Sequence, residues 1–169
     1  GTPEKIGGWT QLGESKLTGV ARGLHHFVNS ASTKFAAIGT NRILYIYSGG
    51  VYYDIHPLVN PSGTAITNCF STTNNDPTVT ITFPGTHSFT AGDIILFGDA
   101  STFSAITNSN FGASDFADKK FMVTSVPTST TITITMPSNE TGSGATTSGG
   151  ITYYQYYHVG PAEQLGAFG

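Results

Sequence analysis

The dominance of glycine, serine and threonine is the feature that most limits what this chain can fold into. These three residue types make up 63 of the 169 residues, and threonine alone accounts for 26. Glycine and threonine are poor helix formers, and no stretch is rich in the Leu, Glu, Lys and Ala that favour helices. Because 38% of the residues are still hydrophobic, a packed core is within reach. The sequence therefore predicts an all-β protein and excludes a helical bundle, a coiled coil and full disorder.

Residues 1–57 are predicted to form a first module, an N-terminal arm followed by a β-meander. Glycines punctuate the arm, residues 1–23, which shows no periodicity. Four apolar segments then follow, joined by short turns of Asn, Ser, Thr, Arg and Gly. We expect one strand in each of these segments: 24–29, 34–40, 43–47 and 51–55. A meander of this size corresponds to one propeller blade.

Residues 58–152 are predicted to form a second module, an inserted small β-barrel or sandwich. Polar and apolar residues alternate in Thr78–Phe83 and in Thr130–Met136. This period of two predicts strands with one buried face and one hydroxyl-rich, solvated face. Further strands are expected at 94–97 and 119–126, with a short one between Gly63 and Phe70, and loops are expected at 98–117 and 137–150.

Residues 153–169 are predicted to return the chain to a main body, so that the chain is a piece of a longer protein. The charges support a division into modules. Residues 1–57 hold five Lys or Arg against three acids, or +2, whereas residues 58–152 hold two lysines against six acids, or −4. The overall formal charge of −3 provides no basic field, so no nucleic-acid partner is predicted. No apolar run approaches the roughly 18 residues of a membrane helix, so no membrane span is predicted.

No segment carries a recognisable catalytic or metal-binding motif. Cys69 is the single cysteine, and a buried structural role is the simplest interpretation. His25 and His26 are neighbours in a predicted strand and so point to opposite faces, which prevents them from sharing one ion. The aspartates of the second module lack EF-hand spacing, although calcium binding by them is left open. We therefore predict no catalytic residues, no metal site and no cofactor.

The aromatic segment near the C-terminus is the most suggestive candidate surface. Tyrosine is favoured at subunit contacts. We predict that four tyrosines of this segment, together with one tryptophan of the arm, are interface residues: Tyr153, Tyr154, Tyr156, Tyr157 and Trp9. Stacking of exposed tyrosines on sugar rings is the rival interpretation.

The first module resembles the N-terminal part of phage tail structural proteins, including nozzle-like proteins with propeller-like bodies. The resemblance is carried by Gly19–Leu24, Phe35–Tyr47 and Val51–Pro57. The second module is similar to a module that is inserted in many phage virion proteins. Its matching segments are Thr78–Phe83, His87–Asp93, Phe121–Val126 and Thr131–Thr135. That module is likened to the small β-barrel half-domain of ubiquitin-activating enzymes, a likeness of fold that implies no ubiquitin chemistry.

The resemblance implies a structural protein of the virion tail that acts by subunit assembly and catalyses nothing. The implied partners are other copies of the chain and other virion proteins. One alternative is a carbohydrate- or receptor-binding module of a tail fibre or adhesin, with a host-surface glycan as its ligand. Another is a hydrolase that cuts a host-surface polymer. An assembly protein is expected to expose apolar arms or an unpaired sheet edge when isolated, whereas a sugar binder is expected to be self-contained, with aromatic side chains around a concavity.

Overall fold

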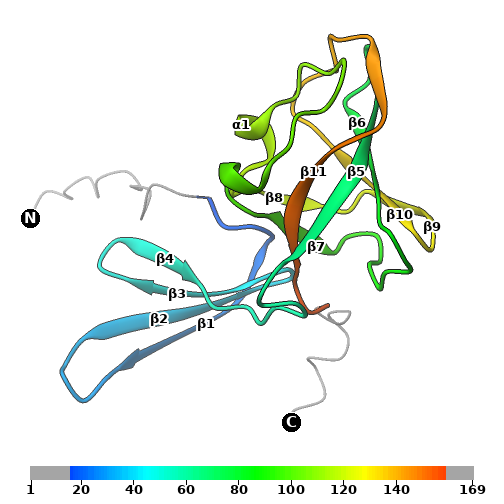
Figure 1. The fold of residues 1–169 in the computed structure, drawn as a ribbon. Coiled ribbons are helices and arrows are strands. Elements are labelled where there is room, and N and C mark those ends of the chain that lie inside the picture. Colours follow the sequence, from blue (N-terminus) through cyan, green and yellow to red (C-terminus); the bar gives the residue numbers. More distant parts are fainter. Residues whose placement is uncertain (1–15, 159–169) are drawn as a thin grey trace, which may run out of the picture. The chain divides into compact units, whose positions relative to one another are not determined.

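The computed structural model describes residues 16–158 and divides the chain into two compact units. Among the described residues, unit 1 ends at His56, and unit 2 comprises Pro57–His158. Nearly all regular structure in both units is β (Figure 1), so the predicted all-β class is confirmed. In the part of the chain that the structure describes, no helix has the length and apolar character needed to cross a membrane.

Unit 1 contains a four-stranded antiparallel sheet. Its strands follow the chain order, as a meander requires: β1 (Ala21–Val28), β2 (Lys34–Thr40), β3 (Leu44–Ser48) and β4 (Val51–Asp54). Gly49 and Gly50 form the tight turn between β3 and β4, and both have positive φ, 58° and 90°. Two-residue hairpins favour glycine there because a side chain disfavours positive φ. The predicted meander is confirmed, with strand ends that move by no more than a few residues.

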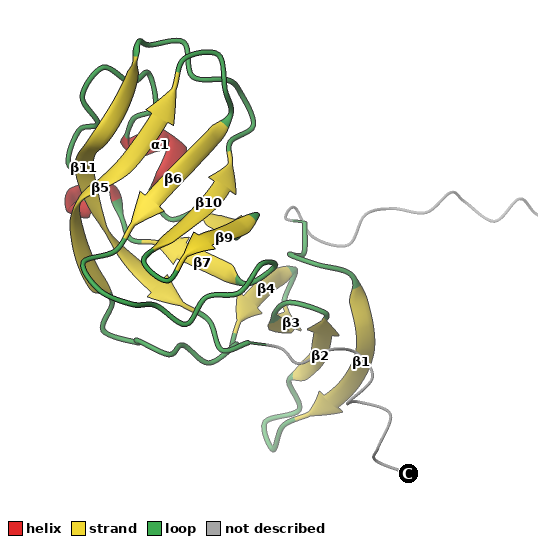
Figure 2. Cartoon of the chain, turned by 90° about the vertical axis from the view of Figure 1, so that its right-hand side faces the viewer, coloured by secondary structure: helices red, strands yellow, loops and turns green. Residues whose placement is uncertain are grey.

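Unit 2 contains a seven-stranded sheet that curls into a half-barrel (Figure 2). Its order across the sheet is β8-β7-β11-β5-β6-β10-β9. The strands are β5 (Thr64–Thr73), β6 (Thr78–Thr82), β7 (Ile94–Phe97), β8 (Lys120–Met122), β9 (Ser125–Thr128), β10 (Thr131–Thr135) and β11 (Gly144–Gln155). Two short helices lie in the connection predicted to be a loop: η1 (Ala100–Thr102) and α1 (Ala113–Phe116).

The alternating threonine pattern determines how β6 and β10 pair. Val79 lies opposite Ile134 and Ile81 opposite Ile132, and all four side chains are buried. The intervening positions pair threonine with threonine on the other face. This arrangement confirms the prediction of amphipathic strands with one apolar and one hydroxyl-rich face. On the second face Thr133 is itself buried, and its hydroxyl lies 2.7 Å from that of Ser125.

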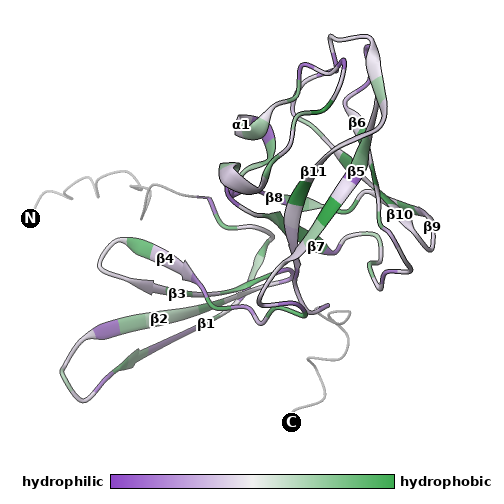
Figure 3. Ribbon diagram, viewed as in Figure 1, coloured by the Kyte–Doolittle hydropathy of each residue, from purple (hydrophilic) through white to green (hydrophobic). Residues whose placement is uncertain are grey.

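An aromatic cluster fills the concave side of the unit 2 sheet. Phe116 of α1 is fully buried, with its ring centroid 4.7 Å from that of Phe70 on β5 and 5.7 Å from that of Phe97 on β7. Figure 3 shows strongly hydrophobic stretches on β5 and β11, the two long strands at the middle of the sheet. The short helix therefore acts as the plug of the half-barrel, and unit 2 has a closed core of its own.

Two sequence predictions in unit 2 are wrong. Residues 137–150 were expected to form a loop, yet β11 begins at Gly144. Its early part pairs with β5 through two register shifts, with positive φ at Thr147 and Gly149. Such bulges remove the alternation on which strand prediction depends. Residues 119–126 were expected to form one strand, but they form two, β8 and β9. β8 pairs with β7, whereas β9 pairs with β10, and the change of partner occurs after Val123.

The segment that contains Tyr153 lies inside unit 2. Tyr153, Tyr154 and Gln155 pair with β7, and Tyr156 forms a bridge to Leu58. The end of unit 2 therefore lies at His158. That unit 2 is an insertion in a longer protein stays a prediction.

Candidate functional site

The register of the unit 1 sheet shows which side chains share each of its two faces. Paired residues on neighbouring strands share a face, and residues alternate along each strand. His25 pairs with Ala37, Ala37 with Ile46, and Ile46 with Tyr53, so these four form one row across the sheet. Phe27 and Phe35 form part of the next row, with ring centroids 5.3 Å apart.

This face carries no charged side chain, and much of it is exposed. We call it the apolar face; its hydrophobic members are Phe27, Phe35, Ala37, Leu44, Ile46, Val51, Tyr53 and Ile55. Tyr53 is 53% exposed, Val51 50% and Phe27 39%. In an antiparallel sheet that is stable on its own, the solvent-exposed face is normally polar. The apolar face therefore has the composition of an interior surface while it is open to solvent.

The opposite face of the sheet is partly covered by the segment that leads into β1. The backbone N–H of Thr18 donates to the hydroxyl of Tyr45 over 3.1 Å, and the hydroxyl of Thr40 lies 2.8 Å from the carbonyl oxygen of Thr18. Leu17 lines a shallow cavity of about 380 Å³ with Leu24, Ile38 and the start of β1. Tyr45 is buried as a result. This face also carries the charged residues Lys34 and Asp54.

Among the described residues, β1 and β4 are the edge strands of the unit 1 sheet. β1 pairs only with β2, and β4 pairs only with β3. β1 is eight residues long, contains no proline and is exposed along its whole length. An unpaired edge offers a row of backbone N–H and C=O groups to any other strand. Assembly through such an edge stays a prediction.

The four predicted interface tyrosines lie in different surroundings. Tyr153 packs against the rings of Phe83 and Phe89, with centroids 5.1 and 6.1 Å away, and burial raises its pKa. Tyr154 is half-buried. Tyr156 is buried within unit 2, and Tyr157 is the most exposed of the four. Trp9 lies outside the described residues, and an interface role for all five stays a prediction.

The apolar face was not predicted from the sequence. The signal for it was present in the apolar residues at every second position of Val51–Ile55, Leu44–Ile46 and Phe35–Ala37. Each run is too short to distinguish a buried face from an exposed one. Only the register of the four strands places these residues on a single face.

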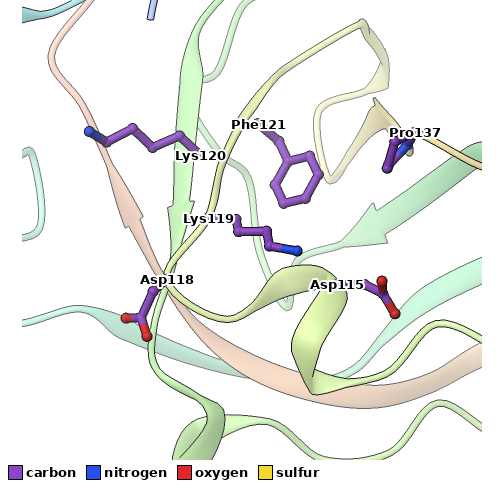
Figure 4. Close-up of a pocket in the computed structure, with 6 residues that line it drawn as sticks. All are labelled: Asp115, Asp118, Lys119, Lys120, Phe121 and Pro137. Atoms are coloured by element: carbon purple, nitrogen blue, oxygen red, sulfur yellow. The ribbon is translucent and has the colours of Figure 1, made fainter. Parts of the chain in front are cut away.

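A cavity of about 390 Å³ lies beside α1 in unit 2. It is lined by Asp115, Asp118, Lys119, Lys120, Phe121 and Pro137. Figure 4 shows that Lys120 and Asp118 extend away from Phe121 and Pro137. The ammonium group of Lys119 donates to the backbone carbonyl of Ser114 over 2.5 Å. The cavity thus combines an aromatic ring with charges of both signs.

Two buried carboxylates of unit 2 hold loops in place. Glu140 is 1% exposed and accepts hydrogen bonds from the N–H groups of Asn110 and Gly142 and from the hydroxyl of Ser109. Burial raises its pKa, but these hydrogen bonds outweigh the burial and lower the pKa below its ordinary value. Asp93 accepts from the N–H of Thr90 over 2.7 Å and lies 2.5 Å from Nδ1 of His158.

The surroundings of the thiol and the spacing of the described acids and histidines provide neither a thiolate nor a metal site. Cys69 is fully buried, and this burial raises its pKa to about 12, which keeps the thiol protonated. Among residues 16–158 no three His, Cys, Asp or Glu side chains are grouped so that they could hold a metal ion. His25 and His26 face opposite sides of β1, as their pairing with Ala37 and Ala36 shows.

Comparison with known proteins gives one distant structural likeness. No protein-family model matches the chain, and no curated protein matches it. Among solved structures it is similar to the phage phi92 endosialidase, with 14% sequence identity and a TM-score of 0.41. The match covers 81% of this chain and 19% of that one, so the chain spans about a fifth of the length of the protein it matches.

The prediction that the chain catalyses nothing is corrected by this finding. The matched protein is, by its name, an enzyme. The absence of enzymatic activity is therefore not retained as a property of this chain. The likeness itself assigns no reaction to the chain.

Proposed function

We propose that this chain is a structural component of a phage virion tail and that it acts by packing against neighbouring subunits. The observation that carries the proposal is the apolar face of unit 1, which is uncharged and open to solvent. A sheet normally buries its apolar face against a second layer. A partner subunit would supply that layer.

The size of the face fits a contact that contributes substantially to assembly. Fully burying one large apolar side chain is worth about 1.5–3 kcal/mol. Five members of the apolar face are exposed: Phe27, Leu44, Val51, Tyr53 and Ile55. Because each is already partly covered, their burial amounts to on the order of 5 kcal/mol per copy. Contacts of this kind are typical of permanent assemblies, whose interfaces are more hydrophobic than transient ones.

The resemblance of residues 19–57 to phage tail structural proteins supports the tail as the location. It also supports other copies of the chain and other virion proteins as the partners. Exposed Tyr157 is the member of the predicted tyrosine set best placed to join such a contact.

The proposal is tested in phage particles that carry variants of the chain. Tyr53→Lys places a charge in the middle of the apolar face, and we expect it to reduce the amount of the chain in purified particles at least several-fold. Val28→Lys is the matched control, since Val28 is similarly exposed but lies on the opposite face, beside Lys34. Absence of the unmodified chain from purified particles, measured by mass spectrometry, would refute the proposed function.

A second candidate function, binding of a host-surface glycan, is favoured by the cavity beside α1. Its aromatic ring, Phe121, and its carboxylates and ammonium groups are the side-chain types that bind sugar rings and hydroxyls. Glycans that raise the melting temperature of the chain, with the shift lost in Phe121→Ala, would support this function. Unchanged melting across a glycan panel would count against it.

A further inference from the structure

β1 is an edge strand without the features that protect the edges of the unit 2 sheet. β8 has only three residues, and β9 contains Pro127, which cannot donate to a further strand. β1 offers eight residues, Ala21–Val28, and contains no proline. In the part of the chain that the structure describes, the only strand that pairs with β1 is β2. β1 therefore remains able to pair with another strand.

The pairing of β1 with β2 determines which backbone groups of β1 point outward. At the turn that joins these strands, the N–H of Asn29 donates to the carbonyl oxygen of Thr33 over 3.1 Å, so these two residues form a hydrogen-bonded pair. Hydrogen-bonded and non-hydrogen-bonded pairs alternate along an antiparallel ladder. The odd-numbered residues of this part of β1 therefore bond to β2. The even-numbered residues direct their N–H and C=O groups away from the sheet: Leu24, His26 and Val28.

We propose that β1 of one copy pairs antiparallel with β1 of a second copy, about a twofold axis at His26. This inference rests on the proposed assembly function and identifies one partner as a second copy of the chain. The three outward residues are spaced symmetrically about His26, so the axis places Leu24 opposite Val28 of the second copy and His26 opposite its own counterpart. Each strand donates and accepts at all three positions, which gives about six backbone hydrogen bonds.

The exposed side chains of β1 favour a second strand beside it over a layer packed on one face alone. Leu24 is 73% exposed and Val28 58%, and both project from the face that carries Lys34. Phe27 is 39% exposed and projects from the apolar face. A layer on the apolar face would leave Leu24 and Val28 in solvent. A strand at the edge of β1 supplies cross-strand neighbours on both faces.

The register about His26 makes the contact complementary to itself. It sets Leu24 opposite Val28 and His25 opposite Phe27, each pair twice, so exposed apolar side chains gain apolar or aromatic neighbours. Residues 23–28 contain no Lys, Arg, Asp or Glu, so no such charges are opposed there. Opposed residues share a side of the sheet, so the apolar faces of the two copies become one surface. The two four-stranded sheets join into one continuous sheet.

The contact is isologous and closes on two copies. It consists of one strand pair, so we expect it to bury less than the roughly 1,200 Å² of a standard stable interface. The dilute chain therefore stays monomeric, and the pairing forms where copies are concentrated or held by other contacts. The apolar face stays available to other subunits.

Cysteine cross-linking in concentrated solutions of the full chain tests the register. His26→Cys places two thiols at a hydrogen-bonded pair with Cα atoms about 5.5 Å apart, within the range of about 4.4–6.8 Å that a disulfide requires. His25→Cys is the matched control, because His25 is also exposed but lies diagonal to its counterpart, at about 7–8 Å. Oxidation is expected to give at least several-fold more dimer from His26→Cys than from the control, and no larger species. Native Cys69 is fully buried and does not compete.

A proline variant separates backbone pairing from chance collisions. The starting variant is Leu24→Cys/Val28→Cys, which is also expected to form dimers. Adding His26→Pro removes an outward N–H that does not bond to β2, a position where an edge strand tolerates proline. We expect this change to reduce the dimer yield at least several-fold, whereas His26→Ala, which keeps the N–H, leaves the yield unchanged. Circular dichroism of both variants checks that the strands are retained.

The outcomes separate this inference from the proposed function. His26→Cys that stays monomeric after oxidation would overturn the inference, as would a control that dimerises equally well or a dimer yield unaffected by His26→Pro. Val28→Lys keeps every backbone group, and its aliphatic stem covers Leu24 of the second copy while its ammonium reaches solvent, so it remains a control for the apolar face. Detection of the chain in purified particles tests the proposed function separately, so either idea can fail while the other stands.

Discussion

The two units of this chain differ in how much of the β-sheet is buried within the unit. Unit 2 curls seven strands round its own aromatic plug and ends its sheet in two short strands. Unit 1 is a four-stranded meander whose apolar face and long edge strand β1 are exposed. Under the proposed function, unit 2 is stabilised from within, whereas unit 1 is completed by contacts with other chains.

The largest expected change in the free energy of unfolding comes from comparing one phenylalanine from each unit. Phe116→Ala removes the plug of the half-barrel, and we expect it to lower the free energy of unfolding of unit 2 by about 3–5 kcal/mol. Phe27→Ala, at an exposed position of unit 1, should cost about 1 kcal/mol or less. Denaturant unfolding followed by hydrogen exchange reports each unit separately. Equal costs for the two variants would remove the contrast.

Glu140 provides the next largest effect, because its carboxylate satisfies several donors in the interior of unit 2. Glu140→Ala leaves the N–H groups of Asn110 and Gly142 without this acceptor, and we expect a loss of about 3 kcal/mol. Asp54→Ala in unit 1 is the matched control, since that carboxylate accepts from the N–H of His56 at an exposed site. Its cost should stay within about 1 kcal/mol.

The same carboxylate makes the stability of unit 2 depend on pH. The folded pKa of Glu140 is lowered, so its contribution is complete at neutral pH and is lost as the pH falls through the lowered folded pKa. Glu140→Gln removes the titrating group and should flatten that part of the acid-unfolding curve. An unchanged acid limb in the variant would show that other carboxylates govern the transition.

Alanine substitutions at one strand glycine from each unit should show a smaller difference in stability cost. A Cβ at Gly150 on β11 would lie 2.5 Å from the carbonyl oxygen of Ile66, so Gly150→Ala should cost about 1–3 kcal/mol. A Cβ at Gly23 on β1 meets no atom within 4 Å, so Gly23→Ala should change stability by less than about 0.5 kcal/mol. Thermal melts of the two variants measure both values. A costly Gly23→Ala would mean that the apolar face is already covered at β1 in the isolated chain.

The smallest expected effect on stability comes from Tyr53→Lys. Tyr53 is exposed, so the change should leave the unfolding free energy of unit 2 unchanged and that of unit 1 within about 0.5 kcal/mol. The same variant should bind less of a dye that fluoresces on apolar surfaces. A strong destabilisation of unit 1 would indicate that the apolar face supports the isolated fold.

Local patterns were sufficient to predict much of the fold. Thr78–Phe83 and Thr130–Met136 alternate cleanly, and β6 and β10 lie there as predicted. Gly144–Gly150 has no such alternation, because β11 is held there by β5, a strand about 70 positions earlier, and is interrupted by bulges. The apolar face was missed for a related reason. It is made by residues from four strands, and only their register places Phe27, Ile46 and Tyr53 on one surface.

Hydrogen exchange of the β1 amides tests the central claim most directly, since that claim is that unit 1 is completed by other subunits. In the isolated chain, the amides of Ala21–Val28 should exchange much faster than those of the central strand β5. In purified particles the β1 amides should become protected to a similar degree as those of β5. β1 amides that exchange at the same rate in the isolated chain and in the particle would contradict the account.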